Sequence, residues 1–176
     1  MDEPVLELET ARRIYRCINK NPGLHLRKIQ RQLDNIPTGT LQYQLTRLEK
    51  DNLISSKADG RYKRYYTAGK IGSAGKIILS ALRKDVQRRI ILYLLLNPGV
   101  KHKDILNQFD LSPSTISFHL KNLTKSGITT QRKIGREVEY LVPNENEVVK
   151  IIMDHKPTFL DKLVDEFTKV WEELHP

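Results

Sequence analysis

The apolar positions of this chain fall at helical spacing over most of its length, and twice the spacing changes to that of a hairpin. The pattern predicts a first helix ending at Asn21-Pro22-Gly23, a short second helix at about Leu26–Leu33 and a third that opens near Pro37. The stretches 53–57 and 62–67 then flank Asp59-Gly60, a hairpin turn signal. The predicted inward residues of the helices are Ile14, Ile18, Leu41, Leu45 and Leu48.

The same pattern of apolar positions and turn signals recurs once, first 76 and then 75 positions later along the chain. Asn97-Pro98-Gly99 repeats the first stop signal, and Ser112-Pro113 supplies an N-cap and a first-turn proline for the second copy's third helix. Other matched pairs are Arg12/Arg88, Ile14/Ile90, Ile29/Ile105, Leu45/Leu120, Leu48/Leu123, Gly60/Gly135, Arg61/Arg136 and Tyr65/Tyr140. A register held over some 55 residues indicates one fold unit used twice.

Three helices followed by a hairpin is the order of a winged helix. We therefore predict a mainly α protein with small β-hairpin wings (an α+β fold): winged helix-turn-helix domains at 1–69 and 70–143, and a helical tail at 144–176. Gly69, Gly72, Ser73 and Gly75 are expected to form a soft joint. A longer helix should run from about Ile77 into the second domain.

Charge is divided unevenly along the chain. Residues 144–176 hold four lysines and eight acidic residues, a net −4, whereas residues 1–143 carry +13, which gives the chain its total of +9. A basic body favours a polyanionic partner, although a Lys/Arg-rich composition is also common in archaeal and thermophilic proteins. Cys17 is the only cysteine and the five histidines are scattered, so neither a disulfide nor a metal site is expected.

The segment Leu111–Ile128 resembles the recognition-helix segment of ArsR-like winged-helix repressors, through Ser112, Thr115, Ser117, His119-Leu120 and Gly127. The whole layout resembles tandem winged-helix transcription regulators of archaea. The resemblance implies double-stranded DNA as partner, no enzymatic activity and no cofactor. Metal sensing is not carried over, because Cys17 stands alone where metal-sensing relatives have ligand sets.

The third helices supply the expected base-contacting surface, since small polar and aromatic side chains can contact base edges and thymine methyls in the major groove. With the apolar stripe inward, one set of side chains in each copy is expected to contact DNA. The alternative for the two aromatic rings is that they pack under the wing or against the other domain. The residues of the two sets are Thr40, Gln42, Tyr43, Thr46, Arg47 and Lys50, then Ser114, Thr115, Ser117, Phe118, His119, Lys121 and Lys125.

The predicted wings carry cations that suit phosphate contact or minor-groove insertion. A solvated charged loop is the alternative. The wing residues are Lys57, Arg61, Lys63 and Arg64 in the first copy and Arg132, Lys133 and Arg136 in the second. The arginines of the first helices, Arg12, Arg13, Arg88 and Arg89, are expected in part to fix the fold.

The tail contains an apolar seam at alternating spacings of three and four. Its residues are Leu160, Leu163, Phe167, Val170 and Leu174, with Trp171 alongside. Two heptads are too short to be stable alone, so the seam must pack on its own domain or on a second chain. We expect a homodimer through these residues.

The sequence supports other functions less well. No phosphate loop, nucleophile–base set or carboxylate cluster outside the tail indicates an enzyme. The absence of a long apolar run or a signal-peptide pattern predicts a cytoplasmic protein without a membrane partner. A basal transcription factor or chromosome-architectural module is the competing function, since winged helices also bind proteins, and contact with transcription machinery is compatible with both.

Overall fold

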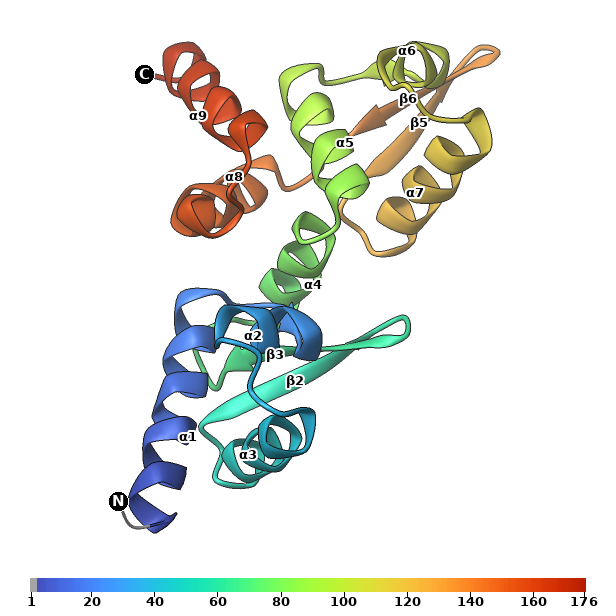
Figure 1. Cartoon of the computed structure of the whole chain (residues 1–176). Helices are drawn as coiled ribbons and strands as arrows, with labels where there is room; N and C mark the ends of the chain where they lie inside the picture. Colours follow the sequence, from blue (N-terminus) through green and yellow to red (C-terminus); the bar gives the residue numbers. More distant parts are fainter. Residues whose placement is uncertain (1–2) are drawn as a thin grey trace. The chain divides into compact units, whose positions relative to one another are not determined.

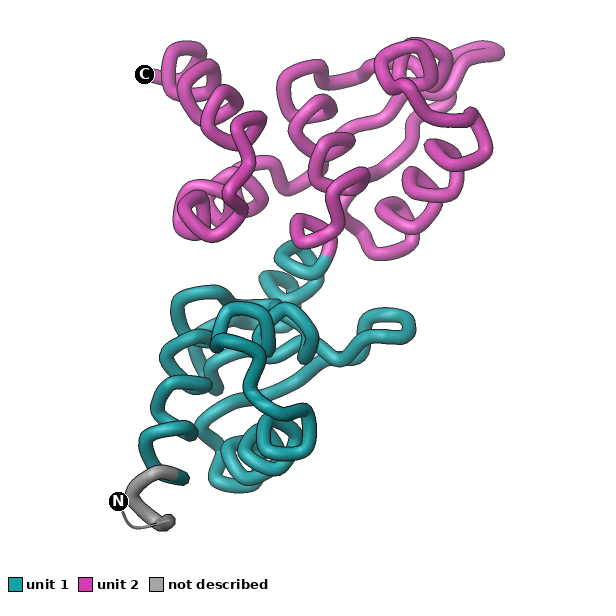
Figure 2. Tube along the Cα trace, in the orientation of Figure 1, with its two compact units in different colours: residues 1–80 teal, residues 81–176 magenta. Residues whose placement is uncertain are grey.

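The computed structural model describes residues 3–176, with side chains in the first helix from Glu7 onward. The chain forms two compact units, residues 1–80 and 81–176 (Figure 2). The domain boundaries expected at 69/70 and 143/144 stay predictions.

Unit 1 has the predicted order of elements. The helices of the winged helix are α1 (Glu3–Lys20), α2 (Leu26–Gln32) and α3 (Thr38–Lys50), and the hairpin consists of β2 (Ile54–Asp59) and β3 (Tyr62–Thr67) (Figure 1). A two-residue strand, β1 (Leu24–His25), pairs with β3 and completes an antiparallel sheet of order β1-β3-β2 among the described residues. Two residues are too few to show alternation, so the hydrophobic pattern did not reveal this strand.

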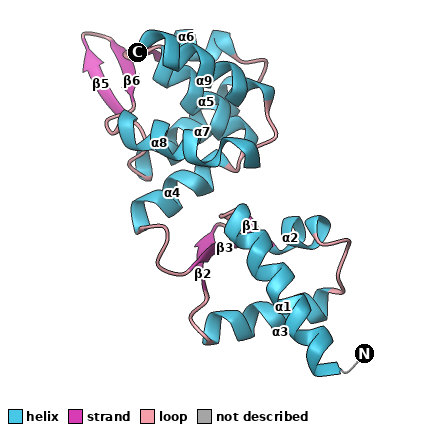
Figure 3. Ribbon diagram, turned by 90° about the vertical axis from the view of Figure 1, so that its left-hand side faces the viewer, coloured by secondary structure: helices cyan, strands magenta, loops and turns pink. Residues whose placement is uncertain are grey.

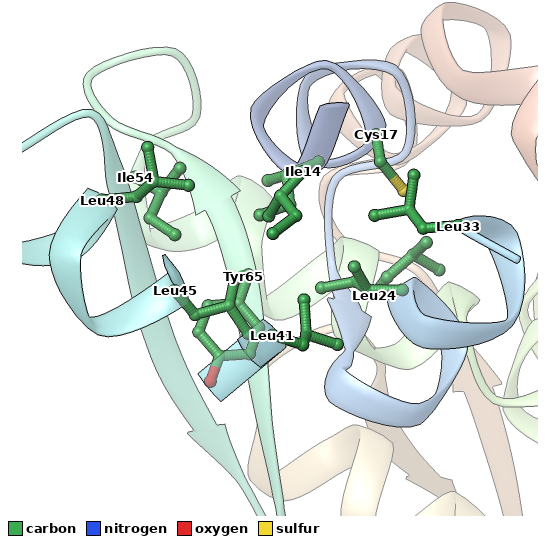
Figure 4. Packing of buried hydrophobic residues seen from close by; sticks show 11 residues of the cluster. Ile14, Cys17, Leu24, Leu33, Leu41, Leu45, Leu48, Ile54 and Tyr65 are labelled. Atoms are coloured by element: carbon green, nitrogen blue, oxygen red, sulfur yellow. The ribbon is translucent and has the colours of Figure 1, made fainter. Parts of the chain in front are cut away.

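The core of unit 1 lies between the three helices and the sheet. Figure 4 shows Ile14 from α1, Leu41 and Leu45 from α3, and Tyr65 from β3 converging on one another. Leu48 and Ile54 close the core at the start of the hairpin. Cys17 is buried in this cluster, as predicted, and its Sγ lies 3.2 Å from Gln32 Oε1.

Unit 2 repeats the arrangement. Its winged helix contains α5 (Asp85–Leu96), α6 (His102–Gln108), α7 (Pro113–Lys125), β5 (Thr130–Ile134) and β6 (Glu137–Leu141), and β4 (Val100–Lys101) pairs with β6. Ile116, Leu120 and Leu123 of α7 are buried as predicted. Strands occur only in these small sheets, and helices make up most of the described chain (Figure 3). The predicted fold class is therefore confirmed.

The expectation of one long helix from Ile77 was wrong. Helix α4 (Ser73–Leu82) ends at Leu82 and α5 begins at Asp85, with Lys84 in an extended conformation between them. Arg88 stabilises the break, because its Nη1 donates to Leu82 O at 2.9 Å and its Nε donates to Asp161 Oδ2 at 2.7 Å. Gly75, expected in the soft joint, lies inside α4.

The tail folds onto unit 2. Helix α8 (Glu145–His155) is followed by a 3-10 turn (Lys156–Thr158) and α9 (Lys162–Leu174). Asp161 caps α9 by accepting from Leu163 N at 3.0 Å. Val164, Phe167 and Trp171 are buried on one side of α9, which contacts α5. One side of the tail helix therefore packs within its own chain.

Candidate nucleic-acid interface

Helices α3 and α7 present matching polar faces in their respective units. On α3 the expected DNA-contacting residues Thr40, Gln42, Tyr43, Thr46, Arg47 and Lys50 are all exposed. On α7, Ser114, Phe118, Lys121 and Lys125 are exposed, whereas Thr115, Ser117 and His119 are partly buried. The helical period that buries the apolar stripe thus leaves the opposite face accessible to a ligand.

An aromatic ring stands at the same position of both faces. Tyr43 is 55% exposed and Phe118 is 61% exposed, although large apolar side chains usually lose most of their surface on folding. Neither ring packs under its own wing, which was the alternative within each unit. Both repeats therefore leave the same aromatic position accessible on the third helix.

The partly buried polar residues of α7 hold the helix in place. Ser112 caps α7, accepting from Thr115 N at 3.2 Å, and its hydroxyl also lies 2.7 Å from Thr115 Oγ1. Ser117 Oγ lies 3.3 Å from His102 Nε2, which joins α7 to the first turn of α6. Thr115 and Ser117 therefore act first as positioning residues for the exposed face.

Gln44 and His119 occupy equivalent positions, and each places a polar atom in the interior. Among the described residues, Gln44 Oε1 and His119 Nδ1 are buried without a hydrogen-bond partner from the protein. Burial lowers the pKa of His119, and the positive charge of Lys84 lowers it further. Both effects favour the neutral imidazole of His119, whose ring lies against Phe118 at a centroid distance of 5.4 Å.

The first wing has three accessible cations, not four. Lys57 is partly buried, and Arg61 and Lys63 are exposed, with Lys63 Nζ donating to Glu49 Oε2 at 2.8 Å. Arg64 is only 4% exposed, and its guanidinium donates to Asp59 and to Gly23 O. The expectation that Arg64 contacts DNA is corrected, because these internal bonds hold its side chain inside unit 1.

The second wing has exposed cations and an internal counter-charge. Lys133 and Arg136 are exposed, and Arg132 Nη2 donates to Glu139 Oε2 at 3.0 Å. Lys101 and Lys103, which the sequence argument did not select, lie beside this wing because both pair with Glu137. The signal was present in the basic triplet 101–103, directly after the Asn-Pro-Gly turn.

The predicted tail seam is divided between two surfaces. Phe167 and Trp171 are buried within unit 2, whereas Leu163, Val170 and Leu174 remain exposed along the adjoining edge of α9. Leu160 precedes the helix, with a positive φ of 50°, and is 91% exposed. The expectation that all six seam residues face one partner is therefore wrong, because the buried side of α9 already packs within unit 2.

The described residues contain no group of three or more His, Cys, Asp or Glu side chains able to hold a metal ion. Within the same part of the chain, no helix has the length and apolarity needed to cross a membrane.

Comparisons with known proteins agree with this geometry. Residues 8–75 match a family described as an N-terminal helix-turn-helix domain, and residues 83–128 match the winged helix-turn-helix DNA-binding family. The chain therefore contains two helix-turn-helix domains in tandem, each followed by a small β-hairpin. The first match includes the whole first wing, whereas the second covers α5, α6 and α7 and stops before β5 and the tail.

One curated relative of this chain is named as an uncharacterized HTH-type transcriptional regulator of Methanocaldococcus jannaschii. It is 36% identical over 141 residues, which cover 80% of this chain and 35% of the relative. The chain thus spans about a third of that relative's length. Among solved structures, HlyU from Vibrio cholerae is similar over 48% of this chain and 90% of its own, at 24% identity and a TM-score of 0.42.

Proposed function

We propose that this protein is a sequence-specific regulator of transcription that binds double-stranded DNA with both winged helices. The third helix of each unit enters the major groove, and the basic wings contact the backbone or the minor groove. The observation that carries the proposal is the repetition of one exposed face: an aromatic ring at Tyr43 and Phe118, surrounded by small polar and basic side chains.

The chemistry of this face suits DNA. Gln42 can form paired hydrogen bonds with adenine, and the rings can contact thymine methyl groups. Lys121 and Lys125 of α7, and Lys50 of α3, are exposed on the same helices and could contact phosphates at the edges of the groove. The helix-turn-helix matches and the name of the archaeal relative support a regulator.

A homodimer through the outer edge of α9 is part of the proposal. Leu163, Val170 and Leu174 form an exposed apolar edge, and a second copy of α9 would bury it. Two chains would place four winged helices on one operator, and twofold protein symmetry favours a palindromic site.

The decisive experiment measures binding of the purified protein to its own upstream DNA and to a scrambled duplex of equal length, over a salt series. Selective binding that weakens with salt supports the proposal, because base contacts and counterion release would both be visible. Equal, weak binding to both duplexes would favour the architectural or basal-factor function, in which the edge of α9 contacts another protein. No binding at low salt would contradict DNA recognition altogether.

A further inference from the structure

Beside the second wing lies a hollow lined by cations and one central carboxylate. It has a volume of about 440 Å³, and β4, α6 and the hairpin β5–β6 contribute to its wall. The polar lining residues are Lys101, His102, Lys103, Gln131, Arg136, Glu137 and Tyr140. Three ammonium or guanidinium groups and one carboxylate line this hollow, and Asp104 and Glu139 add negative charge near Lys101.

Both oxygens of Glu137 are used inside the hollow. Lys101 Nζ pairs with Oε2, and Lys103 Nζ lies 3.0 Å from Oε1. These two hydrogen bonds lower the pKa of the Glu137 carboxyl and keep it ionised. A DNA phosphodiester also presents two anionic oxygens on one atom, so it offers the same two lysines equivalent acceptors.

The repeat shows that the fold does not require this arrangement. Strand pairing places Lys101 opposite Glu139 in unit 2 and His25 opposite Arg64 in unit 1, so the two positions correspond. The counterpart of Glu137 is Tyr62, which stacks on His25 at a centroid distance of 4.7 Å. At the corresponding positions, unit 1 therefore has two aromatic rings and no carboxylate between the basic residues.

We propose that Lys101, Lys103 and Arg136 form a binding site for a DNA backbone phosphate and that the Glu137 carboxylate occupies this site in the free protein. This inference rests on the proposed DNA-binding function. The ion pairs are partly exposed and therefore weak, which allows a phosphate to replace the carboxylate. With Glu137 present, unit 2 therefore gains less binding free energy from the DNA backbone than its lysines would supply without this carboxylate.

The test is a double-mutant cycle on the full chain, with DNA affinity measured by fluorescence anisotropy over a salt series. Glu137→Gln should tighten binding about two- to fivefold at low salt, the range expected from losing an exposed ion pair. It should also steepen the dependence of log K on log salt by up to about 0.9, the value for one additional phosphate contact. Lys103→Gln should weaken binding more in the Glu137→Gln background than in the wild type.

Glu172→Gln is the matched control, because it removes the same charge from an exposed position on α9. An effect of Glu137→Gln no larger than this control would overturn the inference, and so would an equal effect of Lys103→Gln in both backgrounds. Failure of every protein, the wild type included, to bind either duplex would instead reject the proposed DNA-binding function. Circular dichroism of each variant identifies any loss of folding.

Discussion

Arg64 Nε donates a hydrogen bond of 2.6 Å to Asp59 Oδ2, and this pair closes the first hairpin from inside. The same guanidinium reaches Gly23 O at 2.8 Å, which ties the hairpin to the turn after α1. Both side chains of the pair are largely removed from solvent. The wing of unit 1 is therefore anchored by an ion pair whose arginine the sequence analysis had placed among the DNA contacts.

Arg64→Ala should destabilise unit 1 by about 3–5 kcal/mol, because it removes the largely buried ion pair to Asp59 and the hydrogen bond to the Gly23 carbonyl. Urea unfolding followed by circular dichroism should show the loss, whereas fluorescence of Trp171, the only tryptophan, reports on unit 2 and should not change its midpoint. Arg61→Ala, at the exposed wing tip, is the control and should weaken DNA binding without lowering stability. An unchanged circular dichroism transition for Arg64→Ala would show that the pair contributes little.

Phe118→Ala and Tyr43→Ala should reduce selectivity for the operator over scrambled DNA, by about 5- to 150-fold for a lost base contact of 1–3 kcal/mol. Both rings are exposed, so neither truncation should lower the free energy of unfolding. Arg136→Ala should instead weaken binding to both duplexes and reduce the salt dependence by about one phosphate contact. Equal losses on both duplexes for Phe118→Ala would contradict a base-contacting role.

Acid should destabilise unit 2 through two histidines. Burial lowers the pKa of His119 and of His155, with Lys84 and Arg83 adding positive charge nearby, while Asp154 partly offsets the effect at His155. The folded state therefore binds fewer protons than the unfolded chain, whose histidines titrate near about pH 6.5. Their contribution to stability is present above that pH and is lost as the pH falls below it.

The check is the urea midpoint of the Trp171 transition at several pH values between about 7.5 and 5. The midpoint should fall toward acid in the wild type and fall less in His119→Gln. The midpoint is used in place of intensity because His175 stacks on Trp171 at 4.2 Å and can alter its emission. The same pH slope in wild type and variant would contradict the assignment to His119.

Val170→Glu should weaken self-association while leaving the fold intact, because Val170 is 40% exposed beside Leu163 and Leu174 on α9. Sedimentation velocity should show a dimer for the wild type and at least about tenfold weaker association for the variant, as expected at the centre of an interface. Lys169→Glu, on the polar side of the same helix, is the control. A wild type that sediments as a monomer would rule out the proposed homodimer.

The local periodicity of apolar residues predicts much of the fold. The doubled Asn-Pro-Gly stops, the apolar stripe of Leu41, Leu45 and Leu48, and its repeat in α7 predicted the helix-turn-helix of each repeat and both hairpins, but not the break between α4 and α5. These features depend on residues within one or two turns of each other, so a linear sequence displays them. The exposure of Tyr43 and Phe118 followed from the same helical geometry.

Only the tertiary structure decided which charges are available and which apolar residues already have partners. Arg64 and Arg61 look alike in the sequence, but strand pairing turns Arg64 toward Asp59 and leaves Arg61 outside. The Lys103–Glu137 contact joins residues 34 positions apart, and Phe167 is buried while Val170 is not because α5 covers one side of α9. Long-range contacts of this kind depend on how separate elements pack, and no periodicity within one element contains that information.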